Sequence, residues 1–178
     1  MYKRTTLAAL FLSSTLCGTV HAEGGYYGGN FSFLDYSEQG VSDDASLTAI
    51  YGRLGTSFNE NFSGELRIGL GMGDDSVAFD DLDVNVELDN MYGAYVRGGV
   101  PVSEAFFPYV VLGYTRGEVT ASVSGFSSVS VSESDISFGF GSDISVSQNV
   151  SINLEYMNYL DKDGGEISGF AIGVAGKF

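Results

Sequence analysis

Apolar and polar residues alternate with a period of two along most of the chain after residue 25. Between Phe62 and Met72 the even positions are apolar or glycine, whereas the odd positions include Ser63, Glu65 and Arg67. Since successive side chains of a β-strand point to opposite faces, this alternation predicts strands with one apolar face. The even-position pattern recurs in residues 90–102, 150–160 and 168–178, whereas the first strand places Tyr27, Phe31 and Phe33 on odd positions.

Eight strands account for the alternating segments, and each exceeds the ~9–11 residues that a tilted strand needs to cross a bilayer. In the seven later strands, no even position of the spanning stretch carries a charge. The predicted strands are residues 26–36, 47–58, 62–73, 89–102, 106–116, 135–146, 150–160 and 167–178.

Three similar short segments separate some of these strands: residues 58–62, 102–106 and 146–150, whose centres are 44 residues apart. Propeller blades repeat with a similar period, but the chain would hold too few of them and lacks a blade signature. Short turns that alternate with long, acidic loops indicate an up-and-down antiparallel β-structure. The predicted long loops are residues 37–46, 74–89, 116–135 and 161–166, and the alternating stretch 120–132 suggests a hairpin that projects beyond the bilayer.

Six charged residues on the odd face decide which face points outward. They lie at two adjacent levels, five or seven residues from the nearest turn centre, and their charges sum to zero. Such matching favours an ion-pair network inside a closed membrane barrel over an ordinary solvated face on which charges match by chance. Arg53 and Arg67 are equidistant from Glu60, so we expect them to face each other with Glu65 between them. The six residues are Arg53, Glu65, Arg67, Arg97, Asp143 and Glu155.

The positions of glycine and aromatic residues also agree with a closed membrane barrel. Many glycines lie on the odd face, where they leave room for long arginine side chains in a narrow lumen. The lumen of an eight-stranded barrel is filled by its own side chains, so we expect no wide aqueous pore. Aromatic residues on the outward face resemble the two interfacial girdles of membrane barrels. They are Tyr27, Phe58, Phe62, Phe106 and Phe178 near the short turns, and Tyr92, Tyr114 and Tyr156 farther away.

The overall charge excludes several classes of protein. The 178 residues contain 23 Asp and Glu against 8 Lys and Arg, a formal net charge of −15. Such a chain is a poor ligand for nucleic acid or an anionic membrane surface. No apolar run reaches the ~18 residues of a spanning helix, so a helical membrane protein is also excluded.

The first 22 residues have the features of a secretory signal peptide. Lys3 and Arg4 precede an apolar stretch at 7–12, and Val20-His21-Ala22 supplies the small residues of a cleavage site after Ala22. We therefore expect two segments: the signal peptide at 1–22 and a β-barrel domain at 23–178. Cleavage would remove Cys17 and His21, the one cysteine and the one histidine, and would change the net charge to −17. The mature chain could then form no disulfide and could use neither residue type in catalysis or metal binding.

The signal peptide, the eight alternating strands and the C-terminal pattern together resemble a known family. The chain is similar to the small outer-membrane β-barrel proteins of Gram-negative bacteria, of the OmpA membrane domain and OmpX-like type. The resemblance implies an eight-stranded antiparallel up-and-down barrel in the cell outer membrane, with short periplasmic turns and longer extracellular loops. In that family the C-terminal alternation is the signal read by the barrel-assembly machinery; here it comprises Phe170, Ile172, Val174 and Phe178, with the small Gly176 as a departure.

Structural proteins, surface adhesins, resistance factors and narrow channels all occur among such barrels. For this chain we expect a non-enzymatic, monomeric membrane protein without a cofactor, whose lumen is closed by the charged side chains. Its expected partners are outer-membrane lipid, lipopolysaccharide (with divalent cations as possible bridges) and the assembly machinery. The alternatives are a narrow solute channel, a soluble lipocalin-like carrier and a lipid-A-modifying enzyme, although such enzymes rely on the histidine that the mature chain lacks.

Overall fold

The computed structural model describes residues 24–38, 45–79, 82–123, 128–162 and 165–178. The predicted signal peptide therefore lies outside the described residues. Within these ranges no helix is long and apolar enough to cross a membrane. The strands are β1 (Gly24–Glu38), β2 (Ala45–Ser57), β3 (Phe62–Gly71), β4 (Asp74–Phe79), β5 (Leu82–Gly99), β6 (Phe106–Val123), β7 (Val129–Ser145), β8 (Val150–Lys162) and β9 (Gly165–Lys177).

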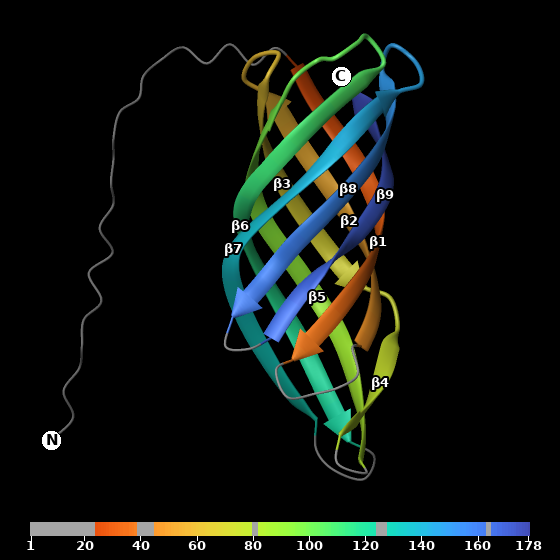
Figure 1. The fold of residues 1–178 in the computed structure, drawn as a ribbon, viewed down its shortest axis with the longest axis vertical. Helices are drawn as coiled ribbons and strands as arrows, with labels where there is room; N and C mark the ends of the chain where they lie inside the picture. Colours follow the sequence, from red (N-terminus) through yellow and green to blue (C-terminus); the bar gives the residue numbers. More distant parts are fainter. Residues whose placement is uncertain (1–23, 39–44, 80–81, 124–127, 163–164) are drawn as a thin grey trace, which may run out of the picture.

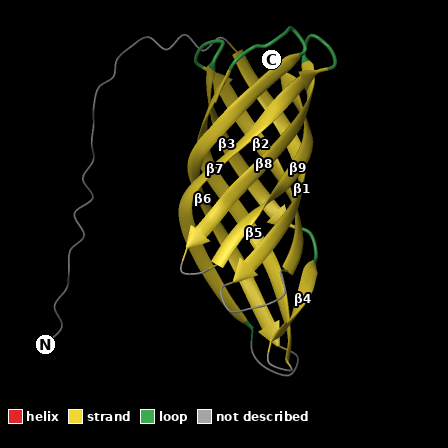
Figure 2. Ribbon diagram, viewed as in Figure 1, coloured by secondary structure: helices red, strands yellow, loops and turns green. Residues whose placement is uncertain are grey.

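The strands form one antiparallel sheet that closes on itself (Figures 1 and 2). Apart from β3 and β4, strands that are neighbours in sequence pair with each other. The pairings of β1 with β9 and of β3 with β5 complete the circle. The short β4 lies outside this circle and pairs only with the first residues of β5 among the described strands. The eight-stranded up-and-down barrel expected from the sequence is therefore confirmed. The predicted loops 74–89 and 116–135 are wrong, because the first contains β4 and the start of β5 and the second contains the end of β6 and the start of β7.

The three short turns share one hydrogen-bonding pattern, as their 44-residue spacing predicts. In each, the amide of the first residue donates to the carbonyl four residues later: Phe58 to Phe62 at 2.9 Å, Val102 to Phe106 at 3.1 Å and Val146 to Val150 at 2.9 Å. All three turns lie at the end of the barrel that carries the C-terminus (Figure 1). The neighbouring strand also contacts each turn at equivalent carbonyls: those of Asn61, Ala105 and Asn149 each accept an amide hydrogen at 2.8 Å.

The apolar face of the strands points outward. Leu66 and Ile68 are 61% and 68% exposed, whereas Arg67 between them is 4% exposed. In β1 the outward side chains include Tyr27 and Phe33, so the predicted odd parity of this strand is confirmed. An apolar exterior around a polar interior is the arrangement of a membrane barrel and the reverse of a soluble one.

Two irregularities in strand pairing change the faces near the long-loop end. The registers shift between Leu88 and Asn90 in β5 and between Asn158 and Leu160 in β8. The alternation predicts an outward Leu160, but this residue is 7% exposed. That expectation is wrong because one extra residue in a strand reverses the faces of the residues beyond it.

Strands β5, β6 and β7 are 18, 18 and 17 residues long, whereas β2, β8 and β9 each have 13 residues. The longer strands project beyond the rest of the barrel at the end opposite the short turns (Figure 1). This agrees with the expected projecting hairpin in residues 120–132, whose tip at 124–127 lies outside the described residues.

Candidate functional site: the interior charge cluster

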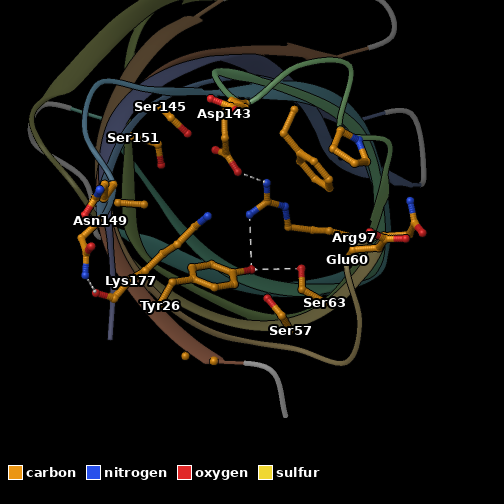
Figure 3. A pocket seen from close by; sticks show the side chains of 18 of the residues that line it. Tyr26, Ser57, Glu60, Ser63, Arg97, Asp143, Ser145, Asn149, Ser151 and Lys177 are labelled. Atoms are coloured by element: carbon orange, nitrogen blue, oxygen red, sulfur yellow. Dashed lines mark hydrogen bonds and ion pairs between the residues drawn. The ribbon is translucent and has the colours of Figure 1, made fainter. Parts of the chain in front are cut away.

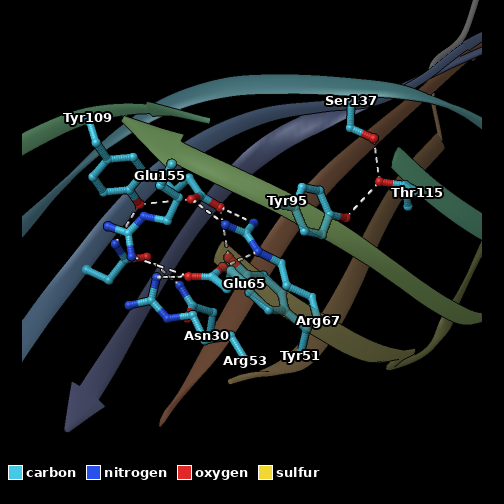
Figure 4. Close-up of polar contacts among 12 residues, drawn as sticks. Asn30, Tyr51, Arg53, Glu65, Arg67, Tyr95, Tyr109, Thr115, Ser137 and Glu155 are labelled. Carbon is cyan, nitrogen blue, oxygen red and sulfur yellow. Dashed lines mark hydrogen bonds and ion pairs between the residues drawn. The ribbon is translucent and has the colours of Figure 1, made fainter. Parts of the chain in front are cut away.

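The six charged residues singled out from the sequence meet inside the barrel (Figure 4 shows most of them). They come from five strands, β2, β3, β5, β7 and β8. Closure of the barrel brings together residues as distant in sequence as Arg67 and Glu155. Five of the six are 3–4% exposed, and the side chain of Asp143 is 19% exposed. We call Arg53, Glu65, Arg67, Arg97, Asp143 and Glu155 the charge cluster.

Glu65 is the centre of the charge cluster. Its carboxylate lies 2.5 Å from Arg67 Nε, 3.3 Å from Arg97 Nη1 and 3.8 Å from Arg53 Nη1. Arg53 and Arg67 are directly opposed across β2 and β3, as their equal distances from the turn imply. Like charges in that position repel each other, so the carboxylate that contacts both compensates for the repulsion.

The other two carboxylates complete the neutral arrangement. Glu155 accepts two hydrogen bonds from Arg67, at 2.5 Å from Nη1 and 2.9 Å from Nη2. Asp143 accepts one from Arg97 Nη2 at 2.5 Å and lies 3.6 Å from Arg53 Nη2. Bidentate arginine–carboxylate pairs are among the strongest charge-assisted hydrogen bonds and also fix the geometry of both partners.

Arg53 is the least well bonded of the three arginines. Its contacts with Glu65 and Asp143 are ion pairs at 3.8 Å and 3.6 Å, and none of its side-chain nitrogens donates a hydrogen bond within the described residues. Its guanidinium therefore contributes mainly through charge, whereas Arg67 and Arg97 also hold carboxylates by direct hydrogen bonds.

Four tyrosines surround the charge cluster, and the sequence analysis did not identify them. The hydroxyl of Tyr26 donates to Glu65 at 2.8 Å, and those of Tyr51 and Tyr109 donate to Glu155 at 3.0 Å and 2.8 Å. The guanidinium carbon of Arg97 lies 3.7 Å from the centre of the Tyr109 ring, and that of Arg67 lies 4.5 Å from the Tyr95 ring. Cation–π contacts of this kind stabilise a desolvated guanidinium.

Each of these tyrosines lies across a glycine of the adjacent strand. The cross-strand pairs are Tyr26–Gly55, Tyr51–Gly69, Tyr95–Gly113 and Tyr109–Gly141. A Cβ atom at Gly55, Gly113 or Gly141 would overlap the facing ring. The interior glycines thus make room for tyrosine rings, rather than only for arginine side chains as expected. The 44-residue repeat carried a signal for this, because it relates Tyr51 to Tyr95 and Gly69 to Gly113.

A second layer fills the lumen between the charge cluster and the long-loop end. Buried apolar side chains from six strands pack together there, including the residues displaced by the two register shifts. The sequence analysis did not predict this layer, because it considered only the charges and glycines of the inward face and not the apolar residues there, such as Met91 and Met157. Only Leu88 and Leu160 turn inward through the register shifts. We call it the apolar plug; its larger members are Leu34, Leu47, Leu88, Met91, Met157, Tyr159, Leu160 and Ile167.

At the short-turn end the lumen is open instead. A cavity of about 660 Å³ lies among the three turns, with Arg97, Asp143 and Tyr26 lining its inner end (Figure 3). Serine pairs from two hairpins, Ser57–Ser63 and Ser145–Ser151, face each other across the strands and line it. The lumen is therefore open at the short-turn end and closed farther in by the charge cluster and the apolar plug. We call the open part the cup.

The C-terminal residues take the outward positions that the alternation predicts. Phe170, Ile172, Val174 and Phe178 are all exposed on the outer face. The backbone of Phe178 exchanges two hydrogen bonds with Gly25, at 2.9 Å and 3.2 Å, so the last residue closes the seam between β1 and β9. Among the described residues, no group of three or more His, Cys, Asp or Glu side chains could hold a metal ion.

Comparison with known proteins assigns the chain to a family. The family described as "Outer membrane protein beta-barrel domain" matches residues 5–178. The chain belongs to this family. The match covers nearly the whole sequence, and the family places the protein in the outer membrane, with its apolar exterior against lipid. A comparison with curated protein sequences gives no significant match.

Solved structures of small barrels share the fold. The attachment invasion locus protein Ail of Yersinia pestis is 17% identical over 88% of this chain and 99% of its own, with a TM-score of 0.65. Neisserial surface protein A is 16% identical over 88% of this chain and 99% of its own, with a TM-score of 0.66. OprG of Pseudomonas aeruginosa is 15% identical over 89% of this chain and 97% of its own, with a TM-score of 0.59. At these identities the likeness concerns the fold.

Proposed function

We propose that the protein is a non-enzymatic outer-membrane barrel with a structural or surface-interaction role and no continuous channel. The observation that carries this proposal is the double filling of the lumen. A solute that enters the cup from the short-turn side meets the charge cluster first and the apolar plug beyond it. An ion would lose its hydration against the buried leucine and methionine side chains, which is energetically costly.

Conductance in planar lipid bilayers tests this proposal directly. Purified, folded protein should give no stable single-channel steps above the background of the bilayer. As a control, a variant that empties part of the apolar plug, Met91→Gly/Met157→Gly, should pass no ions either, because the charge cluster remains beneath it. Regular ohmic steps from the unmodified protein would instead establish the narrow-channel alternative.

A soluble lipocalin-like carrier would need its apolar face inside, which disagrees with the outward position of that face. The absence of histidine and cysteine from residues 23–178 supports a non-enzymatic role, because both residue types are common catalytic groups. Incubation of folded protein with lipid A, followed by mass spectrometry of the lipid, should show no change in acyl chains.

The expected processing and partners of the protein follow from its location in the outer membrane. We infer removal of residues 1–22 by cleavage after Ala22, recognition of the C-terminal residues by the barrel-assembly machinery, and a monomer surrounded by lipid. Lipopolysaccharide would contact the long-loop end, where divalent cations could bridge its phosphates to the acidic loops. The outward phenylalanine at position 178, which is 73% exposed, supports a role in recognition during assembly.

Ail has been crystallised with the heparin analogue sucrose octasulfate. We do not extend a sulfated ligand to this chain, because its long-loop end is strongly acidic and would repel such an anion. Apart from the charge cluster and Lys177 near the short turns, the cations from residue 24 onward are Arg116 and Lys162, against more than a dozen acidic residues.

A further inference from the structure

The cup is a cavity of the size and polarity that small polar molecules need. Its volume of about 660 Å³ falls within the range of ~300–1,000 Å³ that is usual for sites that bind small molecules. Ser57, Ser145 and Ser151 line it, and within the described ranges their hydroxyl groups form no hydrogen bond. The wall of the cup therefore offers hydroxyl groups that are free to bind a ligand.

Lys177 supplies a positive charge to the cup. It has the inward parity of β9 and pairs with Tyr26 of β1, and its side chain extends into the cavity beside the Tyr26 ring (Figure 3). Its backbone amide donates to the carbonyl of Asn149 at 2.8 Å. Its ammonium group forms no ion pair and no hydrogen bond to any described residue. An ammonium group has three donors, and Lys177 presents all of them to the cup.

The other charges at the inner end of the cup already compensate each other. Arg97 Nη2 donates to Asp143 at 2.5 Å, and Asn153 donates to the second oxygen of the same carboxylate at 2.7 Å. Arg97 and Asp143 both belong to the neutral charge cluster, so neither offsets the charge of Lys177. The buried Nε of Arg97 has no acceptor among the residues that the structure describes. The inner cup thus has unused hydrogen-bond donors and one uncompensated positive charge.

The mouth of the cup limits the charge of a ligand. Glu60 and Glu104 occupy the central positions of two turns and are exposed, and the α-carboxylate of Phe178 adds a third negative charge there. The third turn, whose backbone bonds to that of Lys177, has the neutral Gln148 at the central position. A ligand with a single negative charge can reach Lys177 past this turn, whereas the acids repel a dianion such as phosphate about twice as strongly.

We propose that the cup binds a small hydroxycarboxylate, such as a sugar acid, whose carboxylate lies at the Lys177 ammonium group. The ligand's hydroxyl groups would bond to the serine hydroxyls of the wall, because a hydroxyl group both donates and accepts. The site goes beyond the structural or surface role proposed above, since it lies at the short-turn end and needs no macromolecular partner.

The two lysines of residues 23–178, Lys162 and Lys177, provide a direct probe. Reductive dimethylation with isotope-labelled formaldehyde retains the positive charge and gives each lysine its own NMR signal. On titration with D-galacturonate in zwitterionic micelles, the Lys177 signal should shift saturably and the Lys162 signal should not. D-galactose has no carboxylate, acetate has no hydroxyl group and inorganic phosphate has a second charge, so each should bind at least tenfold more weakly.

Calorimetric titration of unmethylated protein with galacturonate tests the contribution of each charge. Lys177→Met should weaken binding at least tenfold, whereas the matched variant Lys162→Met should bind like the unmodified protein. The double variant Glu60→Gln/Glu104→Gln should bind more tightly, because less negative charge opposes the ligand. Binding should also weaken as salt rises, since exposed charges are screened.

The proposal is overturned if galacturonate shifts both lysine signals alike or shifts neither. It is also overturned if galactose or phosphate binds as tightly as galacturonate, or if Lys177→Met binds with unchanged affinity. A heat-modifiability gel on each sample shows by its mobility shift that the barrel is intact, so that a loss of binding by Lys177→Met reports on the site. The NMR titration requires no substitution and decides the question even if that variant does not fold.

Discussion

Replacement of Glu65 by alanine tests whether the charge cluster holds the barrel together. Glu65 contacts all three buried arginines, and its removal leaves them with two carboxylates. At an effective dielectric constant near 20, two unit charges 4 Å apart interact by about 4 kcal/mol. Desolvation offsets much of this attraction, and the removal of one partner from a buried pair typically costs ~3–5 kcal/mol. Since whole domains are stable by ~5–15 kcal/mol, we expect a large loss for Glu65→Ala.

The free energy of unfolding can be measured by urea titration in detergent micelles. The chain has no tryptophan, so the folded fraction is best read from the gel mobility of unboiled samples. Glu60→Ala is the matched control, because this exposed acid lies in a turn outside the charge cluster and should change stability by less than ~1 kcal/mol. The reasoning is refuted if Glu65→Ala unfolds at the same urea concentration as Glu60→Ala.

A second substitution sharpens the same test. Arg53 has no hydrogen bond to a carboxylate, so its removal in the Glu65→Ala background takes away an uncompensated charge with little further loss. The Glu65→Ala/Arg53→Met variant should therefore be no less stable than Glu65→Ala alone. Residues of one network show such non-additive effects, whereas independent residues would add.

Two further predictions concern the two faces of the wall. Gly113→Val should destabilise the barrel by roughly 1–3 kcal/mol, because its side chain would overlap the Tyr95 ring. Gly29→Val is the control, since nothing lies within 4 Å of a Cβ atom there. Equal urea midpoints for the two variants would contradict the packing of Tyr95 against glycine. On the lipid face, Leu66→Arg should lower the free energy of unfolding in lipid vesicles by about 2–4 kcal/mol, whereas Val102→Arg near the membrane boundary should lower it by ~0–1 kcal/mol. A larger loss for Val102→Arg than for Leu66→Arg would place Leu66 away from hydrocarbon.

The sequence predicted the fold through a property that is local to each strand. Parity identifies the outward leucines, and the distance of Arg53 and Arg67 from Glu60 identifies their pairing, because tight turns fix register. The register shifts at Leu88 and Leu160 could not be predicted in this way. A bulge depends on what the neighbouring strands and the lumen require, and no alternation of residues within one strand records that requirement.

The charge cluster was accessible from the sequence for the same reason, since its members stand out on the polar face at matching depths. The tyrosines around it were harder to identify, because a tyrosine suits a lipid boundary as well as an interior. Tyr26 and Tyr109 acquire their role only through the facing Gly55 and Gly141, which belong to other strands. A comparison of equivalent positions across the 44-residue repeat would have revealed part of this arrangement.

Quenching by brominated lipid measures the central claim, which is that apolar side chains face hydrocarbon and the charge cluster is enclosed. Single tryptophans can be placed in the otherwise tryptophan-free chain as Leu66→Trp, Leu154→Trp and Tyr95→Trp. In vesicles with brominated acyl chains, the fluorescence of the first two variants should be strongly quenched and that of Tyr95→Trp should be nearly unchanged. Strong quenching of Tyr95→Trp together with unquenched Leu66→Trp and Leu154→Trp would contradict the account.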